Sequence, residues 1–521
     1  MVLTPNKATM QTTLNLRKIL AAMVVLMPLL LPGQALQWSY NYGGSNTDFL
    51  SRIITSKEGG FMAAGHSISS DHDLPVNSGL FDAWIIKSDD NGHKDFVTVM
   101  GGSENEFVAD LLQREDSLYL VLINSTSADG DFPANAGSTD IWLKGMNISG
   151  TFSAGLRFGG SGNDEATRIV RTLNGGYLIV GKTNSADGTF SGTLGGDDAF
   201  CIRLDPQFQV VWARKYGTKD HDGFVDALAL PDGSLLFYGS KFIGLANTGW
   251  LLKTNPQGDV IDEADIEKFT GFYPVCMQHH DGKFYLAANT DNMIDRVTDQ
   301  HIMVYVYDEN LDYAFMMESG GGAIGTDAIV DMKHYDDDHL LCLVASGTNS
   351  GLFTGSHGGY DLFTLLISDD LLNFFSRPFG GSANEGWALK AAGMCLDGTM
   401  AVVAGNSYSS DGDLPSHYGM GDGWIFKANP LYSLGLQDEG FAAVAGMQVS
   451  PNPAEDEILV SGIPDDAAFI TITDLTGRQV FRTGVDRPSV NIPLSGLPSG
   501  MYLVRAATKG RVLPPVKFVR R

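Results

Sequence analysis

The sequence predicts an all-β protein, a seven-bladed β-propeller followed by a small immunoglobulin-like β-sandwich. Two observations predict the propeller. Each repeat contains four short apolar runs separated by turn residues, and each begins with a GGS-type sequence whose first glycine recurs with a step of 58 residues. These glycines are Gly43, Gly101, Gly159 and Gly217, and then Gly322 and Gly380. A fixed period of this size is typical of propellers and solenoids.

The third repeat shows the four apolar runs, which we name strands a to d. They are Ala166–Thr172, Tyr177–Gly181, Ala199–Leu204 and Val210–Tyr216. Asp-Gly pairs such as Asp232-Gly233 and Asp397-Gly398 lie between strands a and b in other repeats, and such pairs supply the positive φ of tight hairpins. Four antiparallel strands, repeated radially, form a propeller blade. A solenoid is the alternative, but its repeats do not need three hairpin turns each.

The two ends of the repeat region complete each other. The interval between Gly217 and Gly322 has room for two repeats, so a degenerate fifth repeat is expected to start near Gly271. The seventh repeat stops after its third strand, at Lys427. Its missing strand d is found at the other end of the chain, where Leu36–Tyr42 precedes Gly43. We therefore expect this N-terminal strand to close the last blade, which removes two exposed sheet edges.

The charge balance excludes some classes of partner. The chain has 35 Lys and Arg residues against 61 Asp and Glu residues, a net charge of −26. A nucleic-acid-binding protein would need a basic stripe, which the sequence lacks. The same reasoning argues against binding to an anionic membrane surface. An acidic surface instead suits solubility, divalent cations or basic partners.

The N-terminal segment indicates export, whereas the cysteines indicate only burial. Residues 1–35 have a basic start and an apolar run at 19–31, too short to span a bilayer, and are interpreted as a signal peptide. No other apolar run reaches transmembrane length. The four cysteines lie in apolar strands without metal-binding spacing, so we expect buried free thiols. They are Cys201, Cys276, Cys342 and Cys395.

The repeat stops after Lys427, so the sequence divides into four segments. They are a signal peptide at 1–35, the propeller at 36–432, a linker at 433–446 and a C-terminal module at 447–521. The C-terminal module has short alternating strands and Gly/Pro turns, which indicate a small β-sandwich. The plain alternative is an immunoglobulin-like domain without a sorting role.

The C-terminal module resembles a known export signal. Its motifs are a Pro-Asn-Pro at 451–453, then Asp474, Gly477, Arg478 and Val480, and then Leu497, Gly500, Tyr502 and Val504. In this order they resemble the type A C-terminal sorting domain of the type IX secretion system of Bacteroidota. The resemblance implies passage through the periplasm, recognition by the type IX machinery, and release or display at the outer-membrane surface. The repeats also resemble exported kelch-like propeller repeats in blade layout, without the kelch double glycine.

Acidic residues recur at fixed positions in two loops of most repeats. Strand direction alternates, so the d–a and b–c loops are expected to emerge on one face of the disc. Asp-x-Asp pairs in the b–c loops, together with an Asp just before strand c, could supply oxygen ligands for calcium. Turn chemistry is the favoured interpretation, because Asp stabilises turns without any metal. The candidate calcium ligands are Asp71, Asp73, Asp82, Asp129, Asp131, Asp140, Asp187, Asp198, Asp411, Asp413 and Asp422.

The sequence contains no recognisable catalytic motif, such as HExxH, a nucleophile elbow, a Walker loop or CxxC. No catalytic residue or required cofactor is therefore assigned. The first hypothesis is a secreted or surface-displayed protein that binds a glycan or a protein through one loop face. The alternatives are a secreted carbohydrate-active enzyme and a structural or adhesion component. The divergent fifth repeat offers a candidate ligand site at Phe272, Tyr273, His279, His280 and Tyr285.

Overall fold

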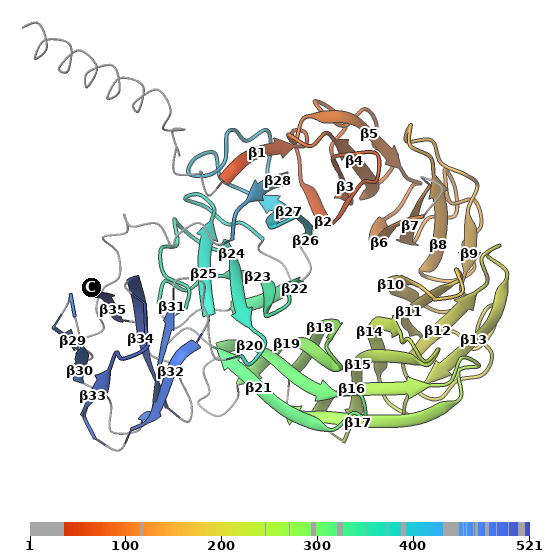
Figure 1. Ribbon diagram of the computed structural model, residues 1–521. Coiled ribbons are helices and arrows are strands. Elements are labelled where there is room, and N and C mark those ends of the chain that lie inside the picture. The colour runs from red at the N-terminus through yellow and green to blue at the C-terminus, as the bar shows by residue number, and fades with distance from the viewer. Residues whose placement is uncertain are drawn as a thin grey trace, which may run out of the picture.

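The computed structural model confirms the predicted all-β architecture. It describes residues 36–521 except 115–117, 245, 270, 293–298, 320–326, 351, 372–373, 387–391, 431–447, 452, 455, 462, 464–466, 475–478, 486, 499 and 509–515. The predicted signal peptide and linker lie outside the described residues. Within the described part of the chain, no helix is long and apolar enough to cross a membrane. Seven four-stranded antiparallel sheets surround a central opening (Figure 1).

Six blades use four consecutive strands each, in the order a to d from the centre outward. Blade 1 consists of β2 (Asp48–Thr55), β3 (Phe61–Ser67), β4 (Asp82–Ser88) and β5 (Lys94–Met100). Blade 2 consists of β6 (Glu106–Gln113), β7 (Tyr119–Ser125), β8 (Asp140–Met146) and β9 (Leu156–Phe158). Blade 3 consists of β10 (Asp164–Arg171), β11 (Tyr177–Thr183), β12 (Asp198–Leu204) and β13 (Val210–Tyr216).

The next three blades follow the same plan, including the degenerate fifth repeat. Blade 4 consists of β14 (Asp222–Ala229), β15 (Leu235–Ile243), β16 (Ala246–Thr254) and β17 (Val260–Phe269). Blade 5 consists of β18 (Gly271–His280), β19 (Lys283–Asn292), β20 (Asp299–Asp308) and β21 (Tyr313–Ser319). Blade 6 consists of β22 (Asp327–Asp336), β23 (His339–Ser346), β24 (Asp361–Ser368) and β25 (Phe374–Phe379). The predicted start of the fifth repeat at Gly271 is confirmed.

The seventh blade joins the two ends of the ring, as predicted. It contains β26 (Gly393–Asp397), β27 (Met400–Ser407) and β28 (Asp422–Ala428), and β1 (Leu36–Tyr42) supplies its outer strand. β1 pairs antiparallel with β28 over nearly its whole length. The indole N–H of Trp424 donates to Ser39 Oγ at 2.8 Å across this junction. The closing strand therefore removes the free edge that β28 would otherwise present.

The hydrophobic core consists of layers between neighbouring blades. Seven buried clusters are present, one for each pair of adjacent blades, including the pair formed by blades 7 and 1. Five blades bury a large aromatic residue two positions after the Asp that begins strand c. These residues are Trp84, Trp142, Phe200, Phe363 and Trp424. All four cysteines are buried free thiols, as predicted.

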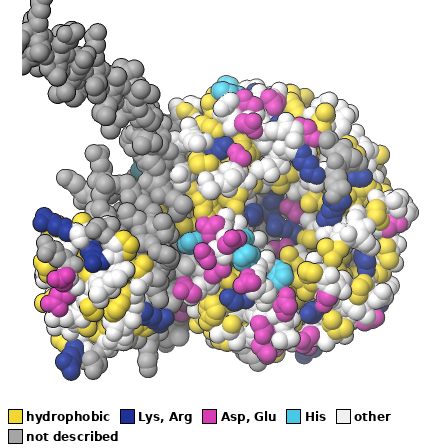
Figure 2. Space-filling view, viewed as in Figure 1, with side chains coloured by type: hydrophobic (Ala, Val, Ile, Leu, Met, Phe, Trp, Pro, Cys, Tyr) yellow, Lys and Arg dark blue, Asp and Glu magenta, His cyan; other side chains and the backbone are white. Residues whose placement is uncertain are grey.

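A ring of charges lines the central channel, which has a volume of about 1100 Å³. Arg168 lies between two carboxylates, with its Nε 3.3 Å from Asp226 Oδ1 and 3.7 Å from Asp110 Oδ2. The negative charge of Asp226, and then that of Asp110, raises the pKa of Arg168. Asp110 also accepts the Ile169 N–H at 3.0 Å, so these buried charges join successive blades. Figure 2 shows acidic and basic side chains together in this opening.

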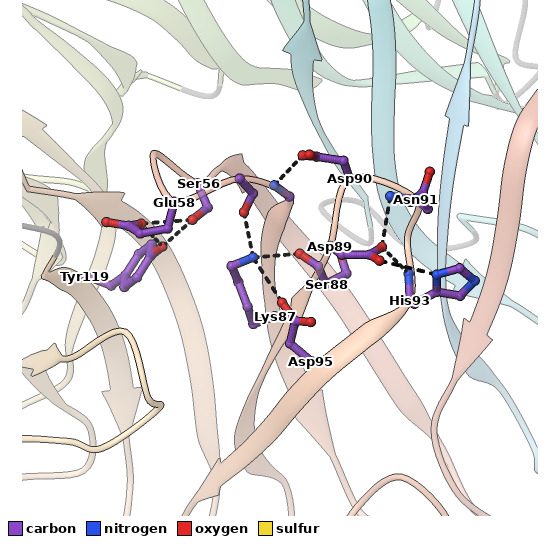
Figure 3. Close-up of polar contacts among 12 residues, drawn as sticks. Ser56, Glu58, Lys87, Ser88, Asp89, Asp90, Asn91, His93, Asp95 and Tyr119 are labelled. Atoms are coloured by element: carbon purple, nitrogen blue, oxygen red, sulfur yellow. Dashed lines mark hydrogen bonds and ion pairs between the residues drawn. The ribbon is translucent and has the colours of Figure 1, made fainter.

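The a–b and c–d turns form one face of the disc, which we call the hairpin face. In blade 1, Asp89 Oδ1 accepts the N–H groups of Asn91 at 2.9 Å and His93 at 2.8 Å (Figure 3). Lys87 Nζ donates to the Gly59 carbonyl at 2.7 Å and so links the two turns of the blade. These are the side-chain-to-backbone bonds that make Asp favourable in tight turns.

The C-terminal module is a two-sheet sandwich. One sheet contains β29 (Gln448–Ser450), β30 (Glu457–Ser461) and β33 (Ser489–Pro493). The other contains β32 (Gln479–Gly484), β31 (Ala467–Asp474), β34 (Gly500–Thr508) and β35 (Val516–Arg520). Ile458 and Ile492 from the first sheet pack with Ile470, Val504 and Phe518 from the second. The module therefore has a hydrophobic core of its own.

Candidate functional site

The d–a and b–c loops share the other face of the disc, which we call the loop face. In blade 3, four consecutive N–H groups of the d–a loop each donate to a side-chain oxygen. The pairs are Gly159 to Thr189 Oγ1 (3.0 Å), Gly160 to Asp164 Oδ2 (2.8 Å), Ser161 to Asp187 Oδ1 (2.7 Å) and Gly162 to Ser185 Oγ (2.9 Å). Blades 1, 2 and 7 repeat this pattern. We call this set of bonds the loop network.

The loop network explains the recurring acid at the start of strand a. This acid is at most 3% exposed in each of six blades. The set is Asp48, Glu106, Asp164, Asp222, Asp327 and Glu385. Glu106 accepts the Ser125 hydroxyl at 2.7 Å in addition to its loop N–H group. Burial raises the pKa of Asp48 and Glu385, while their hydroxyl and N–H donors oppose the rise. These acids have a structural role, because they accept loop N–H groups that would otherwise be buried without a partner, which is costly.

A second buried acid stands at the start of strand c, and in four of its five occurrences Oδ1 faces a marker glycine. It occurs as Asp82, Asp140, Asp198, Asp361 and Asp422, and in each case Oδ1 is buried without a hydrogen-bond partner. Asp140 Oδ2 accepts the Ala136 N–H at 2.7 Å, whereas Oδ1 faces Gly159. A Cβ on Gly159 would lie 2.2 Å from this Oδ1. The oxygen therefore rests on the glycine Cα, where a weak Cα–H···O contact is available.

The electrostatics of these second acids differ between blades. Burial, with the nearby charges of Glu106 and Asp131, raises the pKa of Asp82 to about 6. Asp140 instead has the Arg157 guanidinium at 2.7 Å, and Asp198 has Lys215 Nζ at 3.0 Å. The carboxylate therefore has the same position in these blades, whereas the cation that balances its charge is present in some blades and differs between them.

The Asp-x-Asp acids of the b–c loops also belong to the loop network. Asp71, Asp129, Asp187 and Asp411 each accept the N–H of a loop serine at 2.7 or 2.8 Å. Asp73, Asp131 and Asp413 accept the N–H of the marker glycine at 3.1 or 3.2 Å. Lys94 forms an ion pair with Asp73. The candidate calcium ligands thus already have donors, and the calcium site stays a prediction to be tested.

The five candidate ligand residues of blade 5 lie at the two ends of the blade. Phe272 and Tyr273 begin β18 at the loop face, where Phe272 is buried and Tyr273 is exposed. His279 and His280 end the same strand at the hairpin face, with Tyr285 across the turn on β19. At about 3.3 Å per residue, Tyr273 and His280 are roughly 20 Å apart. The structure therefore does not bring the five residues into one site.

Two groupings were missed by the sequence reasoning. At the hairpin face, His280 stacks on His334 of blade 6, with ring centroids 3.5 Å apart. At the loop face, Phe49, His66, Phe81 and Phe107 form an aromatic cluster between blades 1 and 2. The His66 ring lies 4.9 Å from Phe107 and 5.1 Å from both Phe49 and Phe81.

The aromatic cluster departs from the repeat. Phe49 pairs with His66 across strands a and b, and the same register position in blades 3 and 4 holds Glu165 with Lys182 and Gly223 with Ser240. Burial lowers the pKa of His66 to about 4, so this ring is neutral at neutral pH. Phe107 is nevertheless 39% exposed. A comparison of the repeats at this position is the sequence signal that could have identified the cluster.

Further exposed apolar side chains lie on the b–c loops of blades 1 and 7. They are Val76 and Leu80 on blade 1 and Tyr418 and Met420 on blade 7. The His72 and Tyr418 rings lie 5.2 Å apart, which joins the two loops. Leu80 N–H donates to the Glu104 carbonyl at 3.1 Å, which places this loop beside blade 2. Blades 7 and 1 therefore carry exposed apolar side chains on linked loops, and the blade 1 loop reaches the start of blade 2, where Phe107 lies.

Replacing the marker glycine tests its packing against Asp140. Gly159→Ala is expected to destabilise the fold by about 3 kcal/mol, since the residue has φ of +150° and its Cβ would overlap the carboxylate. Gly192→Ala in the same blade is the matched control, because its φ is +67° and no atom lies within 4 Å of the added Cβ. The control should cost about 1 kcal/mol in denaturant unfolding. Equal losses for the two variants would contradict the packing account.

Calcium addition separates turn chemistry from a metal site. The loop carboxylates already accept N–H groups, so we expect millimolar calcium to change the melting temperature of the chelator-treated protein by less than about 1 °C. A rise of several degrees that is lost in Asp129→Asn would instead support the calcium site.

The C-terminal module matches a known family. Residues 448–517 match the secretion system C-terminal sorting domain. No curated protein matches the chain. Residues 448–517 contain all the motifs that carry the resemblance to type IX sorting domains, from the Pro-Asn-Pro at 451–453 to Val504. The kelch-like character of the repeat stays a prediction.

Several solved structures are similar to the chain at low identity. PorZ, a surface component of the type-IX secretion system of Porphyromonas gingivalis, is 10% identical with a TM-score of 0.28, over 92% of this chain and 75% of that chain. The polysaccharide lyase Uly1 is 8% identical with a TM-score of 0.45, over 75% and 92%. YCF48 bound to D1 peptide is 8% identical with a TM-score of 0.40, over 77% and 99%. These values assign no activity. The sorting domain makes the chain a type IX secretion cargo, a β-propeller protein that is secreted or exported to the cell surface.

Proposed function

We propose that this exported propeller is a binding protein that captures its ligand through the loop face of blades 7, 1 and 2. The aromatic cluster is the observation that carries the proposal. Its four residues are not required by the repeat, and Phe107 exposes a large part of its ring. Aromatic residues in such positions dominate the binding energy of protein interfaces.

The surrounding side chains favour a protein ligand over a glycan. Val76, Leu80 and Met420 are each more than half exposed, and they are aliphatic. Neighbouring exposed apolar side chains with a polar rim are typical of protein-binding surfaces. Exposed acids of the loop network on the same face, such as Asp71 and Asp129, suit a ligand with basic groups at its edge. A glycan ligand is the alternative, and it would depend on the aromatic rings more than on the aliphatic side chains.

Ligand capture by paired variants tests this function. The mature protein is immobilised and exposed to surface extract from the producing cells and, separately, to a glycan array, each with calcium and with chelator. Phe107→Ser should weaken capture of the ligand at least about tenfold, as expected for a hot-spot aromatic residue. Val211→Ser is the matched control, because Val211 is also exposed but lies on the outer strand β13. Melting temperatures of both variants establish that the fold is kept.

The outcomes separate the hypotheses. A protein that is captured by the wild type and by Val211→Ser, and lost with Phe107→Ser, supports the proposal. A glycan that binds the wild type and Val211→Ser but not Phe107→Ser would support the glycan alternative. Capture that is equal for all three proteins would overturn the assignment of the aromatic cluster. Turnover of an arrayed polysaccharide would instead support the enzyme alternative.

A further inference from the structure

A second group of side chains gathers on the hairpin face, at the boundary of blades 5 and 6. It consists of His280 at the end of β18, His334 on β22 and Asp369 directly after β24. One potential ligand atom from each residue lies within 4.8 Å of the other two. Among the described residues, no other three His, Cys, Asp or Glu side chains meet this condition. Figure 2 shows histidine side chains beside acidic ones on the face toward the viewer.

Two atoms of this group are buried without a hydrogen-bond partner. They are Nε2 of His334 and Oδ1 of Asp369. A neutral imidazole keeps a lone pair on one ring nitrogen, and that lone pair can bind a metal ion. Buried polar atoms normally have partners, so these two require an explanation.

The backbone holds the three residues in place. The Asp369 N–H donates to the Asp338 carbonyl at 2.8 Å, which fixes the turn after β24 against the turn between β22 and β23. A register shift between His334 and Asp336 interrupts the pairing of β22 with β23 at the same place. The His280 and His334 rings are tilted by 32° with centroids 3.5 Å apart. This arrangement brings two imidazoles and one carboxylate together on rigid strand ends.

We propose that His280, His334 and Asp369 form a binding site for a divalent transition-metal ion of the zinc class. Two imidazole nitrogens and one carboxylate oxygen are a common ligand set for zinc, and imidazole disfavours calcium and magnesium. An ion would supply the partner that His334 Nε2 and Asp369 Oδ1 lack. It would also join blade 5 to blade 6. The site is on the face opposite the aromatic cluster, so it does not depend on the proposed ligand-binding function.

The site has room for a further ligand on the ion. Three protein ligands leave the fourth position of a tetrahedral zinc ion open. The Tyr285 hydroxyl is buried without a hydrogen-bond partner. Tyr285 belongs to the buried layer between blades 5 and 6.

Cobalt and zinc titrations of the untagged full chain test this site. After chelator treatment, Co²⁺ should bind with one equivalent per chain and produce a visible absorption band, and Zn²⁺ should displace it. His334→Gln and Asp369→Asn should each weaken Co²⁺ affinity at least about tenfold, because even the loss of an outer partner of a metal ligand costs about that much. His93→Gln is the matched control. His93 also faces a carboxylate on the hairpin face, Asp89 at 3.3 Å (Figure 3), but it belongs to no three-residue group.

The control should keep the wild-type affinity, and circular dichroism should show the same fold for all variants. Absence of a one-to-one cobalt complex in the folded wild-type chain would overturn the proposal. Equal affinities for the wild type, His334→Gln and Asp369→Asn would overturn it as well, since the ion would then be held elsewhere. A loss of affinity in His93→Gln that matches the loss in His334→Gln would indicate nonspecific surface binding and contradict the site.

Discussion

The loop network is the interaction on which the rest of the propeller depends. Each d–a loop must turn the chain from the rim of one blade to the centre of the next, and its N–H groups cannot join a sheet. Asp, Glu, Ser and Thr side chains accept these N–H groups from fixed positions in the same repeat. Because an unpaired N–H group in such a loop would be costly, the acids and hydroxyls are required wherever the loop recurs. The marker glycine is required because a carboxylate packs on its Cα.

This network makes the loop face a rigid platform. The seven inter-blade cores and the closing strand β1 hold the blades together. The charges of the central channel add hydrogen bonds and ion pairs between the a strands of neighbouring blades. Residues that the network and the cores do not need are free to differ between blades. The aromatic cluster of blades 1 and 2 and the histidine pair of blades 5 and 6 are such departures. Repeat proteins place specific function on a common scaffold in this way.

Much of the fold follows from the sequence, because the 58-residue period gives the number of repeats and each repeat shows four strands. The marker glycines predict seven blades, and the unpaired Leu36–Tyr42 predicts the closure. The sequence also predicts that the acids share a face. It does not decide between N–H acceptors and metal ligands, because both roles use the same residues in the same spacing. Tyr273 and His280 are far apart because they lie near opposite ends of one extended strand, which divergence from the repeat alone did not reveal.

The hairpin-face group could not be predicted from any motif. His280, His334 and Asp369 come from three strands of two blades, and the contact between Asp369 N–H and the Asp338 carbonyl brings the last of them into place. The aromatic cluster is different, because the repeats can be compared position by position. Glu165 and Lys182 stand where Phe49 and His66 stand in blade 1. That difference is visible in the sequence once the register is known.

Amide hydrogen exchange of the native protein tests the central claim about the loop network most directly. The N–H groups of Gly160 and Ser161 lie in a loop outside the sheets, yet each donates to a carboxylate. They should exchange as slowly as the amides of β10, and orders of magnitude more slowly than the amide of Asn174 in the exposed a–b turn. Exchange of Gly160 and Ser161 as fast as that of Asn174 would show that the carboxylates do not hold the loop, and would contradict the account.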